Sequence, residues 1–162
     1  MIYAIAALDS KNGIADETGI PWDLPADKTY FREKTTGCPI LLGYHMYQEM
    51  GQPLPNRRNI VIVHPGTKLR EGFESVEDPN ELLDTYQASQ EILWIVGGAR
   101  VYEKLLSRTQ RLYLTRIQAD FNCTKFFPRF EDQFILTEQS VAHEDNGLKF
   151  CYEIWDSQSV LK

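Results

Sequence analysis

The stretch Ile92-Leu93-Trp94-Ile95-Val96-Gly97-Gly98-Ala99-Arg100-Val101-Tyr102 decides the fold class. Its first part is an uninterrupted apolar run, which predicts a strand covered on both faces over 92–96. Two glycines follow directly, and a helix is predicted from about Ala99 to Ser107. A buried strand that runs through a tight turn into a helix is typical of an α/β domain with parallel strands.

The flanking sequence repeats this alternation. Further buried strands are predicted over 2–8, 39–43, 59–63 and 112–115. Helices are predicted over 25–34 and 45–50, and a third begins at Asp78-Pro79-Asn80-Glu81, with Asp78 as its N-cap. Asp145-Asn146-Gly147 predicts a hairpin turn between strands 134–142 and 148–155. We therefore expect one domain, 1–162, with a mostly parallel sheet and an antiparallel edge.

Composition excludes several classes of protein. Hydrophobic residues make up 43% and charged residues 25% of 162 residues, as in ordinary globular domains. The net charge of −6 argues against a nucleic-acid partner. No apolar run reaches the roughly 20 residues of a membrane helix, and the first run ends too early, at Asp9, for a signal peptide. Three cysteines without a CxxC motif predict reduced thiols, a cytoplasmic location and no metal site.

Asp27 is the first candidate for chemistry. On the helix predicted from Pro25, Leu24, Asp27 and Phe31 share the face that packs on the sheet, so burial is expected to raise the pKa of Asp27. With Trp22 and Phe31 nearby, the carboxylate suits a flat heterocycle with an amidine-like edge. The alternative is an acid placed only by the helix macrodipole.

Two strand-to-helix turns are candidates for binding phosphate. Gly97 and Gly98 let an anion approach the backbone, with Arg100 as a nearby cation. Gly43-Tyr44-His45-Met46 forms a second such turn. Neither matches the GxGxxG fingerprint of dinucleotide-binding folds, and the alternatives are a simple tight turn and a surface histidine.

Arg57 and Thr115 complete the candidates. Arg57 follows the stiff Leu54-Pro55 turn and can clamp a carboxylate, although an ordinary solvated Arg57-Arg58 pair is the alternative. Thr115 is polar within an apolar strand, so its hydroxyl needs a buried acceptor, a role that Asp27 can fill. No serine elbow, HExxH motif or Walker lysine is present.

Taken together, these segments resemble dihydrofolate reductase over almost the whole chain. The segments that carry the resemblance are Ile5-Ala6-Ala7, Ile14, Pro21 to Asp27, Phe31, Leu54-Pro55, Arg57, Val96 to Tyr102, Leu112 to Thr115 and Phe127-Pro128. The resemblance implies an eight-stranded mixed sheet with four helices and a cis Gly97–Gly98 peptide. It also implies reduction of 7,8-dihydrofolate to tetrahydrofolate, with hydride passing from NADPH to pterin C6 and a proton reaching N5.

The resemblance also implies roles for individual residues. Asp27 pairs with pterin N3 and the 2-amino group, Thr115 supports it, and Arg57 clamps the glutamate tail. Asp27, Trp22, Ile20 and Thr115 form the catalytic set. Substrate-binding residues are Ile5, Asp27, Lys28, Phe31, Met50, Leu54, Arg57, Val96 and Thr115. The loop 12–24, which carries Ile20, acts as a lid. Antifolates are the expected inhibitors.

On the cofactor side the resemblance implies contacts from Ala7, Ile14, Ile20, Gly43, His45, Met46, His64, Gly97, Gly98, Ala99, Arg100, Val101 and Tyr102. The sequence departs from the family here, because Tyr44 and Met46 stand where Arg and Thr are common, and Thr124-Lys125 stands where Asp-Thr is usual. Ala15 stands at a common glycine of the lid. We therefore expect a weakened NADPH preference, with NADH tolerated.

Two other functions compete with this interpretation. A pyrimidine reductase of riboflavin synthesis would share the fold and cofactor, but its substrate has no tail for Arg57. A nucleotide-binding domain without activity would bind cofactor and not turn it over. No zipper pattern or large apolar patch indicates a partner chain, so a monomer is expected.

Overall fold

A computed structural model describes residues 1–162. Eight strands cross its main sheet in the order β10-β11-β7-β1-β6-β3-β4-β5, and β9 also pairs with β11. The strands of this sheet are β1 (Ile2–Leu8), β3 (Ile40–Gly43), β4 (Asn59–Ile62), β5 (Phe73–Val76), β6 (Leu93–Gly97), β7 (Arg111–Ile117), β9 (Phe134–Gln139), β10 (His143–Asp145) and β11 (Leu148–Ser157). The helices are α1 (Pro25–Thr35), α2 (Tyr44–Glu49), α3 (Asn80–Gln87), α4 (Ala99–Leu105) and the 3-10 helix η1 (Leu106–Arg108).

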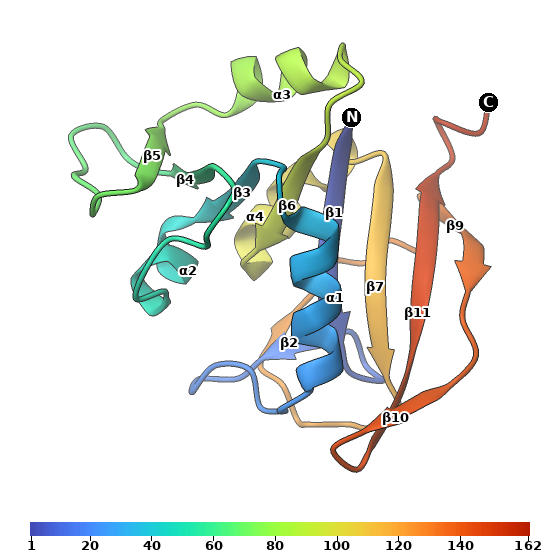
Figure 1. Cartoon of the computed structure of the whole chain (residues 1–162). Coiled ribbons are helices and arrows are strands. Elements are labelled where there is room, and N and C mark those ends of the chain that lie inside the picture. The colour runs from blue at the N-terminus through green and yellow to red at the C-terminus, as the bar shows by residue number, and fades with distance from the viewer.

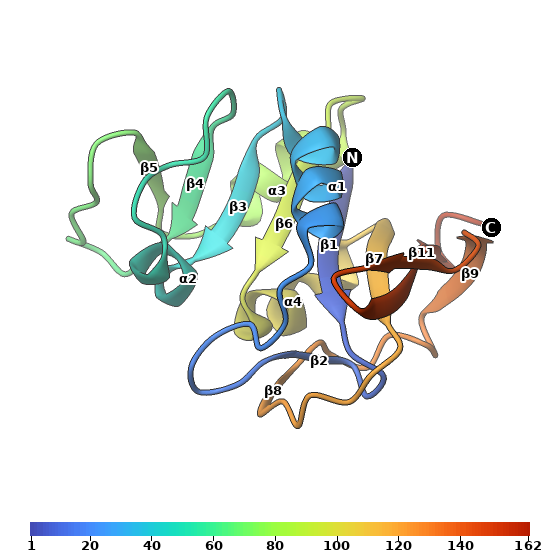
Figure 2. The same cartoon turned by 60° about the horizontal axis from the view of Figure 1, so that its bottom comes forward.

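Helices cover both faces of the sheet (Figure 1). One hydrophobic cluster joins α3 and α4 to the sheet through residues such as Leu83 and Leu105. A second cluster lies on the opposite face, where Phe31 of α1 and Tyr47 of α2 pack against the sheet. Figure 2 shows α1 lying over the sheet, with α3 and α4 behind it. Burial on both faces explains why β6 consists of five buried residues.

The parallel core places the candidate residues at one edge. β1 pairs in parallel with both β6 and β7, whereas β11 is antiparallel to β7. Because the carboxyl ends of parallel strands meet at one edge of a sheet, Ala7, Gly97 and Thr115 come from neighbouring strands at that edge.

The predicted α/β fold with a mostly parallel sheet is confirmed. The predicted helix N-terminus at Asp78 is one residue early, since the N-cap position is Pro79, although Asp78 Oδ1 still accepts a bond from Asn80 N. The predicted strand 134–142 is interrupted, because β9 ends at Gln139 and β10 begins at His143. Both segments pair with β11, so they share one edge of the sheet.

A small second sheet joins the predicted loop 12–24 to a distant segment of the chain. Its strands are β2 (Gly13–Ala15) and β8 (Lys125–Phe126), which are antiparallel. The sequence did not predict β2, β5 or β8. A Cβ on Gly13 would lie 2.5 Å from Cys123 Cβ, so only glycine permits this approach of the two segments.

Two further features of the structure concern membrane-spanning helices and metal-binding clusters. No helix combines the length and the hydropathy needed to cross a lipid bilayer. No group of three or more His, Cys, Asp or Glu side chains is arranged to hold a metal ion.

Candidate active site

Asp27 lies in the first turn of α1, on the side that faces β7. Pro25 begins the helix at a position where its missing N–H costs no hydrogen bond. The Thr115 hydroxyl of β7 donates to Asp27 Oδ1 at 2.6 Å, and the Thr115 side chain is fully buried. This is the only hydrogen bond to the Asp27 carboxylate, so its other acceptor positions are free for a ligand.

Burial raises the pKa of the Asp27 carboxyl above its usual value, and the hydrogen bond from Thr115 opposes that rise in part. No Lys, Arg or His forms an ion pair with Asp27. A partly desolvated carboxylate without a cation favours a ligand that brings two adjacent N–H donors.

Apolar side chains gather beside Asp27 on the α1 side of the sheet. The residues predicted to line a substrate pocket belong to one hydrophobic cluster, in which Ile5 and Val96 are buried and Phe31, Met50 and Leu54 are partly buried. Trp22 and Ala7 pack on an adjoining cluster around Leu24. The structure thus brings the predicted apolar substrate residues together.

Arg57 has a fixed orientation. Its Nε donates to the Pro55 carbonyl at 2.9 Å, and its Nη1 donates to Thr35 Oγ1 at 2.8 Å. The Nη2 group has no partner within the protein and can meet an anion. Lys28 is different, because it forms an exposed ion pair with Asp23 at 3.3 Å.

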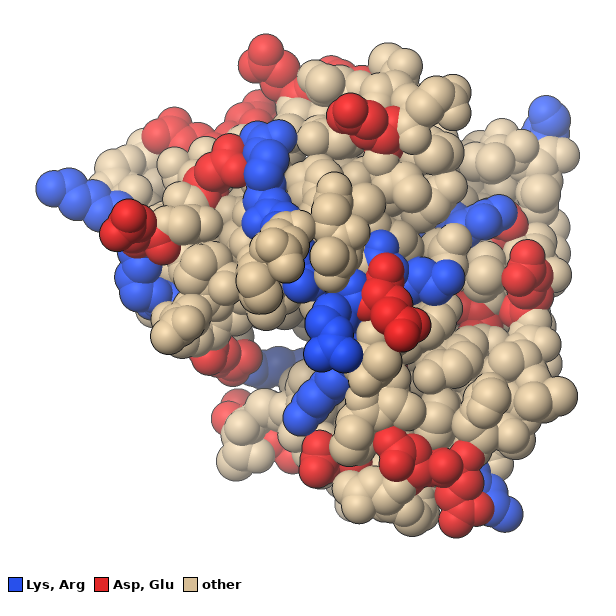
Figure 3. All heavy atoms as spheres, viewed as in Figure 1, with Lys and Arg blue, Asp and Glu red and all other residues tan.

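The surface near these residues is hollowed and basic. In Figure 3 a notch opens between the part of the molecule that carries α2 and the loop that follows β2. Lys and Arg side chains gather over α1, which carries Lys28, Arg32 and Lys34. An anionic substrate would be attracted to this face despite the net charge of −6.

The turn after β6 provides an open backbone. The Gly97–Gly98 peptide is cis, as the family resemblance implies, and Gly97 has φ 124°. A Cβ on Gly98 would meet no atom within 4 Å, so a ligand can reach this backbone closely. Tyr102 instead directs its hydroxyl inward, where it donates to the Ile5 carbonyl at 2.6 Å. Val101 is buried, and one of its methyl carbons lies 2.8 Å from a Cβ built on Gly43.

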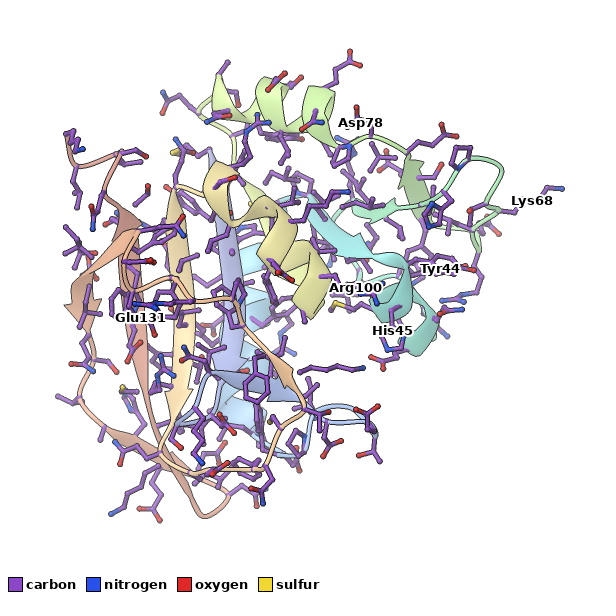
Figure 4. The ribbon with its side chains drawn as sticks, turned by 180° about the vertical axis from the view of Figure 1, so that it is seen from behind. Tyr44, His45, Lys68, Asp78, Arg100 and Glu131 are labelled. Atoms are coloured by element: carbon purple, nitrogen blue, oxygen red, sulfur yellow. The ribbon has the colours of Figure 1, made fainter.

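Basic side chains border this open turn. Figure 4 shows His45 at the start of α2 and Arg100 at the start of α4. A Cβ on Gly43 would lie 3.9 Å from Gly98 N, so the two helix starts are neighbours. Arg100 is exposed and forms no hydrogen bond or ion pair with protein atoms. These features fit a phosphate-bearing dinucleotide, with Ala99, Met46 and the exposed His64 also near strand ends on this side.

Comparisons with known proteins agree with this geometry. The family model described as dihydrofolate reductase matches residues 1–157. A dihydrofolate reductase of Bacillus subtilis (strain 168) is 30% identical over 165 residues, which cover 100% of this chain and 98% of the relative. The chain belongs to the dihydrofolate reductase family.

A further relative and a solved structure give the same result. A dihydrofolate reductase of Haemophilus influenzae is 34% identical and is aligned over 88% of this chain and 89% of its own. The structure of the dihydrofolate reductase from Enterococcus faecalis, complexed with NADP(H) and RAB-propyl, has a TM-score of 0.88 and 29% identity, covering 98% of this chain and 96% of that chain. As a dihydrofolate reductase, the chain catalyses the NADPH-dependent reduction of dihydrofolate to tetrahydrofolate.

The loop 12–24, predicted to act as a lid, packs on the core at its base and is exposed at its tip. Ile14, the central residue of β2, packs against the core, whereas Ile20 is 67% exposed. The Trp22 ring lies 5.2 Å from that of Phe121, so the end of the lid packs on the segment that precedes β8.

Asp9, which is fully buried where the loop 12–24 begins, was not predicted from the sequence. Its carboxylate accepts backbone N–H bonds from Lys11, Gly13 and Phe121 at 2.9, 2.7 and 3.1 Å. Burial alone would raise the pKa of Asp9, but these bonds outweigh it and hold the pKa below its usual value. A turn-forming Asp after a strand gives no sequence signal for such burial.

Proposed function

We propose that the chain binds the pterin ring of 7,8-dihydrofolate through Asp27 and reduces the ring at C6 while N5 is protonated. The observation that carries this proposal is the partly buried Asp27 carboxylate, whose only hydrogen bond comes from Thr115. Pterin N3 and the 2-amino group present two parallel donors that match its free acceptor positions.

Asp27 acts through its charge. The carboxylate stabilises positive charge on the bound ring and so raises the basicity of N5, which takes its proton from water. Thr115 orients the carboxylate, and Trp22 and Ile20 close the reacting region against bulk water. When bound, NADPH supplies the hydride from nicotinamide C4.

The remaining substrate contacts run from the pterin ring toward the glutamate tail. Ile5, Phe31, Met50, Leu54 and Val96 would enclose the flat ring and the benzoyl group in the apolar cluster. Arg57 would bind the α-carboxylate of the glutamate, because two of its nitrogens are already held by the protein. Lys28 would add long-range attraction. Antifolates with the same donor edge would compete at Asp27.

On the cofactor side, Ala7 and Ile14 would meet the carboxamide, and Ile20 would cover the nicotinamide. Gly97, Gly98 and Ala99 would admit the dinucleotide backbone, with Gly43, His45, Met46 and Arg100 around its phosphates. Val101 and Tyr102 shape the turn from within, since both are buried.

We expect a weak preference for NADPH over NADH. Tyr44 replaces a common arginine, is 41% exposed and packs on Tyr47, so it brings no cation to a 2′-phosphate. His64, which follows β4, would replace part of the missing contact to the 2′-phosphate. The ratio of kcat/KM values for the two cofactors should stay below about 1,000-fold, equivalent to about 4 kcal/mol. Tyr44→Arg should raise the ratio by about tenfold. A ratio above about 1,000-fold in the unaltered chain would contradict this expectation.

A substrate comparison tests the proposed function. Purified protein with NADPH is mixed with dihydrofolate or with the deaminated pyrimidine substrate of riboflavin synthesis, and cofactor absorbance is followed. Oxidation with dihydrofolate alone is expected. Oxidation with the pyrimidine alone would support the related reductase, and cofactor binding without oxidation would support a binding domain.

We also propose a cytoplasmic monomer. Cys38, Cys123 and Cys151 are all free thiols, which suits a reducing compartment. Sedimentation velocity at micromolar concentration should give one species of 18.7 kDa.

A further inference from the structure

Lys125 occupies an unusual position at the border of the cofactor side. It lies in β8, and its Nζ is 3.3 Å from Nε2 of His45 in α2. Lys125 is half-buried and has no carboxylate within ion-pairing distance. Two basic side chains from separate elements meet at this border, and their combined field attracts an anion.

The surroundings of this pair are also basic. Arg100 lies at the start of α4, whose first turn adjoins that of α2 (Figure 4). Two acids lie nearby: Glu49 Oε1 is 3.3 Å from the same Nε2 of His45, and Asp16 accepts hydrogen bonds from the backbone and hydroxyl of Thr18. Three elements far apart in sequence thus bring His45, Arg100 and Lys125 to the same border.

Lys125 is also tied to the lid. Its partner in the register of the small sheet is Ala15, and the neighbouring Thr124 N–H donates to the Ala15 carbonyl at 3.0 Å. Thr124 Oγ1 donates to Glu17 at 2.8 Å. An anion held between Lys125 and His45 would therefore hold the lid strand β2 against α2.

We propose that Lys125 binds the diphosphate of the dinucleotide cofactor, together with His45, and so couples cofactor binding to the position of the lid. This inference rests on the proposed function, since it needs the cofactor to bind on this side. The lysine supplies a cation on the side of the molecule where Tyr44 stands in place of a common arginine. It acts on the phosphates shared by NADPH and NADH, and not on the 2′-phosphate.

Lys125→Met tests the proposal because it keeps an unbranched chain and removes the charge. Dissociation constants for NADPH, NADH and dihydrofolate are measured by quenching of tryptophan fluorescence. We expect NADPH and NADH to bind about five- to tenfold more weakly and dihydrofolate to bind unchanged. Lys125→Arg should restore most of the affinity. Lys149→Met, an exposed site in β11, is the control for net charge and should leave all three constants unchanged.

A second readout addresses the lid. Hydrogen exchange of 13–15 at saturating NADPH should be slower than without cofactor in the unaltered chain, and less slowed in Lys125→Met. Equal cofactor affinities in Lys125→Met and Lys149→Met would overturn the proposal, as would a loss confined to NADPH, which would place the lysine at the 2′-phosphate. Failure of the unaltered chain to bind NADPH would instead refute the proposed function.

Discussion

Asp27→Asn is expected to lower kcat/KM for dihydrofolate by about 100- to 1,000-fold at neutral pH, without loss of the fold. The amide keeps the size of the carboxyl and can still accept from Thr115, but it carries no charge to raise the basicity of N5. Activity of the variant should rise as the solution becomes more acidic, because protonation of the substrate then no longer depends on Asp27. The measurement is the pH profile of kcat/KM for both proteins.

Asp132→Asn is the control, because Asp132 is exposed and lies outside every candidate site. Its profile should match that of the unaltered chain. An Asp27→Asn protein with unaltered kcat/KM at neutral pH would exclude the role assigned to the carboxylate.

The same substitution should stabilise the fold. Burial raises the pKa of Asp27 in the folded state, so its contribution to stability is present at acidic pH and is lost as pH rises through that raised pKa. At neutral pH the Asp27 carboxylate is partly desolvated in the folded protein, whereas in the unfolded chain the same charge is fully hydrated. Asp27→Asn removes it, and the free energy of unfolding should increase by about 1 kcal/mol. Urea unfolding at neutral and acidic pH measures this, and the gain should shrink in acid.

Arg57→Leu should raise KM for dihydrofolate by about 100-fold and change kcat little. The guanidinium is held by Pro55 and Thr35 away from the pterin site, so its loss removes binding of the glutamate tail alone. A dihydropterin without the tail should be reduced equally well by both proteins.

The neighbouring Arg58 supplies a matched control. It pairs with Glu74 at 2.9 Å on the surface, and Arg58→Leu should leave KM within about twofold. Equal effects of the two substitutions would exclude a specific clamp at Arg57.

Elements with strong local patterns were predictable. The continuous apolar residues of β1 and β6 and the Pro25 start of α1 set their boundaries to within a residue or two. The contact between Asp27 and Thr115 also followed from sequence, since a polar residue in a buried strand requires a partner.

The parts that escaped prediction depend on long-range pairing. Strands β2 and β8 have three and two residues, too few for a periodic pattern. The edge strand β5 has two exposed central residues, so it carries no continuous apolar run. The Lys125–His45 contact joins residues 80 positions apart, and only the assembled sheet brings them together.

Transfer of deuterium from NADPH that carries deuterium at both positions of nicotinamide C4 tests the central claim most directly. Labelled cofactor and dihydrofolate are incubated with the protein, and the product is analysed by NMR. The account predicts tetrahydrofolate with deuterium at C6, formed by the unaltered chain and strongly reduced with Asp27→Asn. Cofactor oxidation that leaves C6 unlabelled, or no oxidation in the presence of dihydrofolate, would contradict it.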